Sequence, residues 1–220
     1  TTKGNYNISF KNNMKIKSFL LIAAFCVSAQ AADEMSVMKL KAMKRCEGCD
    51  LSGADLYYAN LEGVNLSGAN LTKANLTKAN LLNANLTNAN LTNAILTSAI
   101  LENANLKEAN LKEAILKNAN LKEANLKGAN LLNANLEGAN LLNANLEDAK
   151  LKSANLNGAD FRVADLRGAN LKGADLEDAN LIAANLKRAN LTKANLTNAN
   201  LRYANLCKTI MPWGEDNSGC

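Results

Sequence analysis

A five-residue unit repeats 32 times without a break between Asp50 and Leu206. The unit reads Ala-Asn-Leu-x-x, and residues 69–73, Ala-Asn-Leu-Thr-Lys, are one example. Leucine occupies its position in 31 of the 32 units, with Phe161 in the other, and alanine occupies its position in 30. The position between them, here called the asparagine position, holds Asn in 23 units. A short, fixed period of this kind constrains the architecture of a chain more than any other sequence feature.

The repeat separates positions that are expected to be buried from positions that are expected to face water. The alanine and leucine positions accept almost nothing else, whereas the last two positions accept Lys, Glu, Thr, Asn and Gly alike. Alanine and leucine lie two residues apart, so they point to the same side of an extended chain. An α-helix would rotate the leucines by about 140° per unit, and a flat strand would reverse them at every unit. We therefore expect short extended stretches joined by bends, which wind into a coil with Leu and Ala inside.

This tandem Ala-(Asn/Asp)-Leu-x-x pattern resembles the pentapeptide-repeat family. The resemblance implies an all-β fold, a right-handed quadrilateral β-helix with one unit on each side and four units in each coil. The 32 units then form about eight coils, and residues 20 apart stack on one side. Stacked Asn side chains are expected to hydrogen-bond along the rod and to help satisfy the backbone at the bends.

The beginning of the chain predicts export. Residues 14–31 combine a basic start, an apolar run from Phe19 to Val27 and the sequence Ala29-Gln30-Ala31, which is typical of a signal peptide cleaved after Ala31. The apolar run is too short to cross a bilayer, so no stable membrane span is expected after cleavage. Residues 1–13 precede a Met that can serve as a start, and we expect them to be disordered. We expect a periplasmic or extracellular bacterial protein, with a thylakoid lumen as the less favoured compartment.

Cleavage would also change the charge of the chain. It removes four lysines and no acid, so the formal net charge of +5 falls to +1. Outward columns such as Lys107, Lys127, Glu147, Arg167 and Lys187 mix both signs, which is typical of a solvated surface. Neither observation favours nucleic acid as a partner.

The segments that flank the repeats are expected to close the ends of the coil, because a solenoid exposes apolar side chains there. Residues 32–48 predict an N-terminal cap with a short helix, and residues 49–207 form the repeat domain. Residues 208–220 form a C-terminal cap, in which Pro212 makes a turn and Trp213 plugs the last coil.

Four cysteines remain after signal cleavage, and an even number in an exported protein favours disulfides. Each end of the repeat domain holds one local pair, so we predict the bonds Cys46–Cys49 and Cys207–Cys220. A redox centre or half of a zinc site at Cys46 and Cys49 are the alternatives. The chain contains no His to complete a zinc site, and the motif lacks the β–α context of a redox protein.

Aliphatic side chains at outward positions are the candidate protein interface. Isolated exposed aliphatic residues are ordinary on protein surfaces, so a solvated surface without a partner is the alternative. The candidates are Leu82, Ile95, Ile100, Ile115, Leu142, Val163 and Ile182.

The sequence gives no indication of catalysis or of a cofactor. It has no His to act as an imidazole base, no glycine-rich phosphate loop, and acidic residues that do not converge. We predict a non-enzymatic exported structural or protein-interaction solenoid with a protein partner; a homodimer is an open alternative. A second function, a DNA-mimicking inhibitor or protector of DNA gyrase, comes from the resemblance but requires a strongly acidic cytoplasmic protein. A third is a thiol-redox protein acting through Cys46 and Cys49.

The mass of the accumulated protein tests both the signal and the disulfides. We expect a chain that begins at Ala32 and is lighter by four hydrogens than its reduced form, because two bonds each remove two. Intact-mass measurement with and without reductant checks this. A full-length chain, or four alkylatable thiols without reduction, would contradict the prediction.

Overall fold

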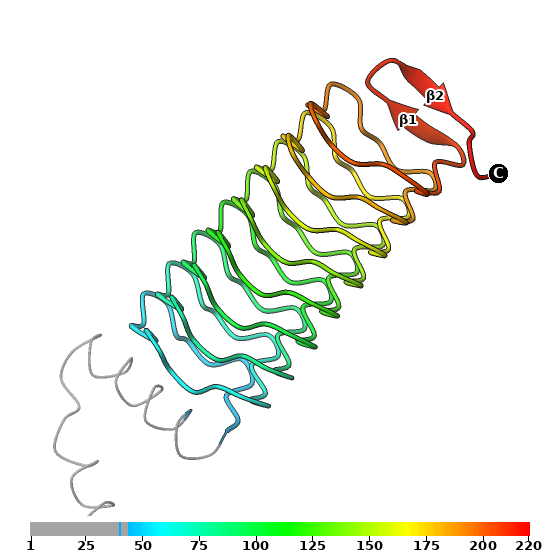
Figure 1. Cartoon of the computed structure of the whole chain (residues 1–220). Helices are drawn as coiled ribbons and strands as arrows, with labels where there is room; N and C mark the ends of the chain where they lie inside the picture. The colour runs from blue at the N-terminus through cyan, green and yellow to red at the C-terminus, as the bar shows by residue number, and fades with distance from the viewer. Residues whose placement is uncertain (1–39, 41–43) are drawn as a thin grey trace, which may run out of the picture.

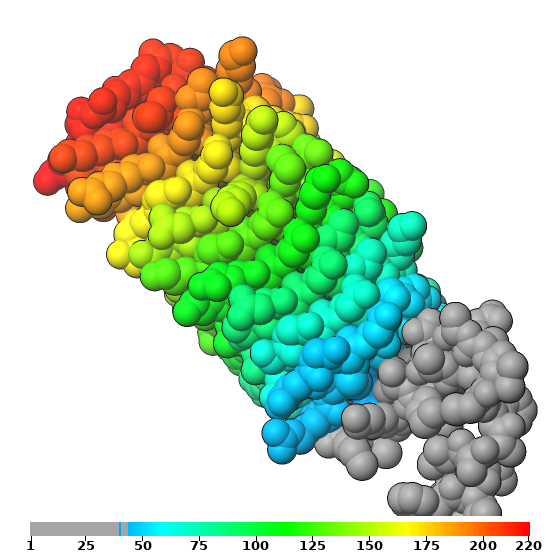
Figure 2. Space-filling model, turned by 180° about the vertical axis from the view of Figure 1, so that it is seen from behind, coloured from blue at the N-terminus to red at the C-terminus, as the bar shows by residue number. Residues whose placement is uncertain are grey.

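The computed structural model, which describes Leu40 and residues 44–220, is a four-sided coil with a hairpin at its C-terminal end (Figure 1). Successive coils stack along one axis, and the space-filling view shows them as parallel bands (Figure 2). The predicted upstream extension, the signal peptide and most of the N-terminal cap lie in residues 1–39 and 41–43, outside the described residues.

Parallel bridges between neighbouring coils define the register. The asparagine position of each unit pairs with the residue 20 later, from Arg45↔Asn65 to Asn190↔Ile210. The Leu121 N–H donates to the carbonyl of Asn140 at 2.7 Å, and the Asn120 N–H donates to the carbonyl of Ala99 at 2.9 Å. Each side of a coil is therefore hydrogen-bonded to the coil before it and the coil after it. This confirms four units per coil, and the right-handed sense stays a prediction.

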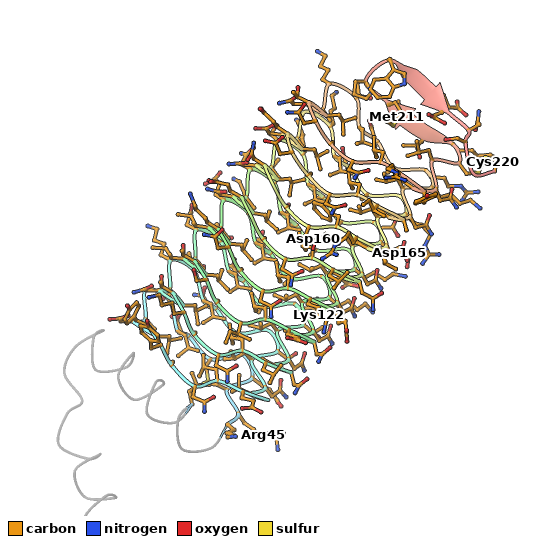
Figure 3. All side chains as sticks on the ribbon, in the orientation of Figure 1. Arg45, Lys122, Asp160, Asp165, Met211 and Cys220 are labelled. Atoms are coloured by element: carbon orange, nitrogen blue, oxygen red, sulfur yellow. A yellow bond between two sulfur atoms is a disulfide. The ribbon has the colours of Figure 1, made fainter. Side chains whose placement is uncertain are left out.

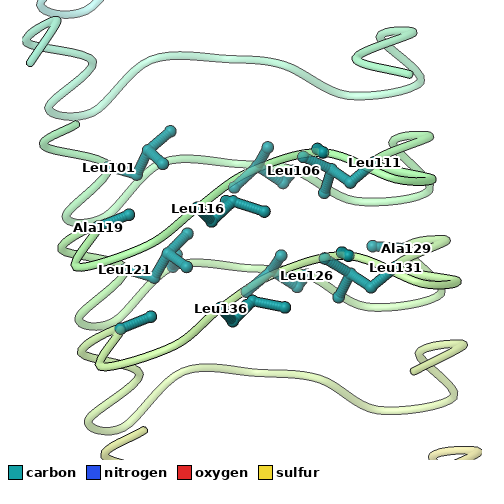
Figure 4. Close-up of a cluster of buried hydrophobic side chains, with 14 of the residues drawn as sticks. Leu101, Leu106, Leu111, Leu116, Ala119, Leu121, Leu126, Ala129, Leu131 and Leu136 are labelled. Carbon is teal, nitrogen blue, oxygen red and sulfur yellow. The ribbon is translucent and has the colours of Figure 1, made fainter. Parts of the chain in front are cut away.

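The inside of the coil is filled by the leucine and alanine positions, as predicted. Leu101, Leu106, Leu111 and Leu116 make one layer, and the leucines 20 residues later lie directly under them (Figure 4). These side chains have no exposed surface, and Phe161 is equally buried. Full burial of one leucine contributes about 1.5–3 kcal/mol before the loss of chain entropy, so stability accumulates coil by coil.

The bends occur at the last two positions of each unit, which we call the first and second turn positions. The alanine N–H of the next unit closes the bend, as in the 3.0 Å bond from Ala124 to the carbonyl of Leu121. The second turn position has φ between 53° and 68° in every described unit of the repeat, the left-handed region that a type II turn requires. Gly and Asn, which adopt it at low cost, hold many of these positions. Val163, at φ 60°, is the single β-branched residue among the described second turn positions.

The repeat register extends one unit beyond the predicted boundaries at each end. Arg45 already pairs with Asn65, which places Cys46 at a leucine position and Cys49 at an alanine position. Leu40, helical and buried, lies before this unit. At the other end, Ile210 pairs with Asn190 and therefore takes an asparagine position.

The C-terminal hairpin corrects one prediction. It consists of β1 (Thr209–Met211) and β2 (Gly214–Asp216), paired antiparallel. Met211 occupies the next leucine position and is only 2% exposed, whereas Trp213 is 69% exposed. The prediction that Trp213 plugs the last coil is wrong, because Met211 continues the leucine register over the coil (Figure 3) and Trp213 falls in the turn that follows.

Val163 provides a test of the bend geometry. Replacement by Asn should raise the free energy of unfolding by about 1 kcal/mol, because Asn tolerates left-handed backbone better than a β-branched residue does. Chemical denaturation of the purified protein measures the change. Thr97→Asn, at a first turn position where φ is not left-handed, is the control and should change stability by less than about 0.5 kcal/mol. Equal effects of the two substitutions would contradict this account.

Candidate interaction surface

The asparagine side chains cap the bends, and in short runs, here called ladders, they also bond from one coil to the next. The Oδ1 atom of Asn120 accepts the N–H of Lys122 at 3.2 Å, so the side chain caps the bend that follows it. Its neighbour in the next coil, Asn140, donates from Nδ2 to the Oδ1 of Asn120 at 3.2 Å. Asp serves the same purpose as an acceptor, as where Asn75 donates to Asp55 at 3.0 Å. The predicted ladder is therefore present, and any residue without an amide or carboxylate interrupts it.

Three isoleucines interrupt the ladders. Ile95, Ile100 and Ile115 occupy asparagine positions and are 37%, 42% and 39% exposed. Ile95 and Ile115 are bridge partners in adjacent coils, and Ile100 lies on the neighbouring side. Among the described residues, no oxygen accepts the N–H of Glu102, which an Asn in place of Ile100 would cap. These isoleucines therefore lack the side-chain hydrogen bonds that Asn makes at this position, and they expose aliphatic surface.

Of the other four candidate residues, Leu82 lies one coil before Ile100 on the same side, and the remaining three lie farther along the rod. Leu82, Leu142 and Ile182 are half-buried, and Leu82 and Leu142 lie three coils apart. Val163 is 56% exposed, and its N–H donates to the carbonyl of Ile182 at 3.0 Å. The structure thus brings together two pairs, Ile95 with Ile115 and Val163 with Ile182.

Both pairs of cysteines lie within bonding distance at the two ends of the rod. The Cys46 and Cys49 sulfurs are 2.02 Å apart with Cα atoms at 5.2 Å, and the Cys207 and Cys220 Cα atoms are 4.7 Å apart. Cys46 is 2% exposed at a leucine position, whereas a redox cysteine needs an accessible sulfur. Within Leu40 and residues 44–220, no cluster of three metal-ligating side chains occurs. No helix in that part of the chain is long and apolar enough to span a membrane.

Ion pairs neutralise much of the charge on the side that carries the mixed column described above. Arg167 binds Asp165 at 2.6 Å and Glu147 at 3.3 Å, and Lys127 binds Glu147 at 2.8 Å. Burial raises the pKa of the Asp165 carboxyl, but hydrogen bonds from Arg167 outweigh it, so the pKa lies below its usual value. Glu147 and Arg167 line part of an open groove of about 550 Å³, together with Asp148, Lys187 and Arg188. The groove therefore mixes charges of both signs.

The arginine beside Asp160, on the preceding side, forms a similar pair. Arg162 binds the carboxylate at 2.7 Å, and its side-chain hydrogen bonds lower the pKa of Asp160. Asp160 also caps its own bend by accepting the Arg162 N–H at 3.1 Å. The acidic residues at positions 160, 165 and 175 therefore act as ladder or turn-capping residues and do not form a pair for acid–base chemistry.

Two neighbouring sides of the C-terminal half carry opposite charge, a feature that the sequence analysis missed. The lysine side, defined as units 129–133, 149–153, 169–173 and 189–193, contains four lysines and no acid. The acid side, defined as units 134–138, 154–158, 174–178 and 194–198, contains four acids and no Lys or Arg. Counting the variable positions at steps of 20 residues would have found this separation.

Comparisons with known proteins agree with the repeat. The family model described as pentapeptide repeats, in eight copies, matches segments that together cover residues 45–211. HetL, a pentapeptide repeat protein involved in heterocyst differentiation regulation from the cyanobacterium Nostoc, is 36% identical over 77% of this chain and 88% of its own, with a TM-score of 0.39. A pentapeptide repeat protein of the Arabidopsis thaliana thylakoid lumen is 36% identical over 48% of this chain and 70% of its own, with a TM-score of 0.37.

A more distant similarity involves QnrB1, a plasmid-mediated fluoroquinolone resistance protein. It is 17% identical over 70% of this chain and 90% of its own, with a TM-score of 0.39. No match was found among curated proteins.

Ile100 tests whether the interrupted ladder costs stability. In Ile100→Asn, the new side chain can cap the Glu102 N–H and bond to Asn80 and Asn120, so we expect a gain of about 0.5–1.5 kcal/mol in the free energy of unfolding. Ile182→Asn, at a first turn position without a ladder, should give no gain. Thermal and denaturant unfolding measure both, and a loss of stability in Ile100→Asn would contradict the interpretation.

Proposed function

This chain belongs to the pentapeptide-repeat family, and we propose on that basis that it acts without catalysis, as an exported rigid scaffold that binds a protein partner. The repeat uses its alanine and leucine positions for folding, which leaves the outward positions free to carry recognition. The rod is hydrogen-bonded throughout its length, so its sides hold outward side chains at regular spacings. Such a surface can bind a partner without paying a large ordering cost.

The isoleucines at asparagine positions carry this proposal. Each one gives up a side-chain hydrogen bond that most other units make, and each is more than a third exposed. Folding alone favours Asn there, so the aliphatic side chains indicate a contact with another molecule. Exposed apolar surface that contributes nothing to folding is typical of a protein interface.

The proposed oxidising compartment is supported by the ends of the rod. Disulfides persist in exported proteins and are rare in the reducing cytosol, and both cysteine pairs lie within bonding distance. The signal-like residues 14–31 point to the same compartment.

The two alternative functions have weaker support. A DNA mimic needs acidic charge along the whole rod to imitate phosphates, and here the acid side lies next to a side of equal and opposite charge. A thiol-redox role needs an accessible sulfur, and Cys46 is buried. We expect no effect of the protein on gyrase supercoiling and no reduction of insulin.

Partner capture from the native cell envelope tests the proposal. The variant Ile95→Asn/Ile100→Asn/Ile115→Asn should lose at least tenfold of the captured partner while unfolding at an equal or higher temperature. The control Lys73→Asn/Ser98→Asn/Ser153→Asn, at second turn positions, should retain the partner. Unchanged capture by the isoleucine variant would contradict the proposed interface.

A further inference from the structure

The lysine side carries cations that no acid of the described chain neutralises. Lys150, Lys152, Lys172 and Lys193, the cations of the lysine side, are all exposed. Within the described residues, none of the four takes part in an ion pair. By contrast, the lysines at 112, 117, 122 and 127 in the middle of the rod each bind a glutamate. The lysine side therefore presents four unneutralised cations to the solvent.

One of these lysines occupies a position where folding favours another residue. Lys150 holds an asparagine position, between Asn130 and Asn170 on the same side. Asn130 and Asn170 cap the bends that follow them, by accepting the N–H groups of Leu132 and Lys172 at 3.3 and 3.2 Å. Lys150 has no oxygen with which to cap the Lys152 N–H. A cation has replaced a stabilising amide here, which indicates that positive charge is needed on this side.

On the neighbouring sides of the same coils, the positive and negative charges lie apart from each other. The acid side carries Glu137, Asp175, Glu177 and Asp178, and the remaining two sides of the same coils each carry a net charge of +1. A nearly neutral rod thus has one side at +4 next to one side at −4. A partner that meets the lysine side encounters a local charge that the total charge hides.

Two exposed apolar residues lie in the C-terminal cap, and one of them, Ile210, extends the lysine side. Ile210 continues that side, because it pairs with Asn190 and its N–H donates to the carbonyl of Ala189 at 2.9 Å. It is 46% exposed, and Trp213, in the turn between β1 and β2, is 69% exposed. Met211 is the buried residue of this segment, and Ile210 and Trp213 lie outside the core.

We propose that the lysine side, together with Ile210 and Trp213, binds the surface of an anionic lipid bilayer. Lysines attract a protein to anionic headgroups, and an exposed Trp with an aliphatic neighbour anchors it at the interface. The stacked units make a flat side, which matches a planar membrane. Nucleic acid fits this side less well, because the side has no arginine to form bidentate hydrogen bonds with phosphate groups. The membrane contact is independent of the proposed protein partner, which would use other sides.

Vesicle binding tests this proposal, and the chain supplies its own probe, since Trp213 is its single tryptophan. Sedimentation with vesicles of phosphatidylcholine alone is compared with vesicles of equal parts phosphatidylcholine and phosphatidylglycerol. We expect binding to the anionic vesicles only, a blue shift of the Trp213 emission on binding, and loss of both as salt concentration rises.

Two matched double variants distinguish binding through the lysine side from attraction by the net charge of the whole protein. Lys150→Asn/Lys172→Gln should weaken binding by about tenfold or more, at roughly fivefold per lysine. Because Lys150→Asn supplies an oxygen that can cap the Lys152 N–H, we expect the variant to be as stable as the wild type, which thermal unfolding checks. Lys122→Gln/Arg202→Gln removes the same charge from the opposite side and should bind within about twofold of the wild type. All variants share one N-terminal segment, so its contribution cancels in the comparison.

Three outcomes would overturn the proposal. The first is no binding to the anionic vesicles at low salt. The second is equal weakening by the two double variants. The third is vesicle binding without a shift in the Trp213 emission. Tight binding of double-stranded DNA that depends on Lys150 and Lys172, without vesicle binding, would assign the lysine side to nucleic acid instead.

Discussion

The hydrogen bonds between one coil and the next support every other feature of this protein. Except in the terminal coils, the N–H at each leucine position donates to a carbonyl 19 residues later, and the N–H at each asparagine position donates to a carbonyl of the preceding coil. These bonds align the leucines into stacked layers, and the layers exclude water from the bonds' inner face. The hydrogen bonds and the leucine layers depend on each other. A single coil could not bury its leucines, and a stack of coils without leucines would have no apolar interior.

On the outside of the rod, the asparagine positions favour residues that can accept a hydrogen bond. This preference is weaker than the requirement for Leu and Ala inside, so its exceptions are informative. An asparagine position is best filled by a residue that caps a bend and bonds along the ladder. Where Ile95, Ile100, Ile115 or Lys150 stands there instead, some stability is given up. Within the 32 units, the three aliphatic exceptions lie in the N-terminal half of the rod and the single cationic exception, Lys150, lies in the C-terminal half. This division is the physical basis for two separate contacts, one with a protein and one with an anionic surface.

The ends of the rod follow the same repeat with different side chains. Cys46 and Met211 each take a leucine position, so the register continues through both capping segments. Cysteine at such a position fills less volume than leucine, and the bond to Cys49 ties the bend together. At the other end, Cys220 returns to Cys207 and ties the hairpin to the last coil (Figure 3).

The sequence by itself determined the inside of this protein. The recurrence of Leu and Ala identified nearly all of the buried positions within the coils, and the pairing of nearby cysteines followed from their spacing. Tertiary structure decided which outward residues become neighbours, because a period of five does not by itself say how many units close a coil. Only the winding at 20 residues per turn brings Lys150, Lys172 and Lys193 onto one side and separates them from Asp175 and Glu177. The tertiary structure also decided that Met211, and not Trp213, packs against the last coil. The coil beneath fixes which position of the chain is buried, and Met211 occupies that position although Trp213 has the larger side chain.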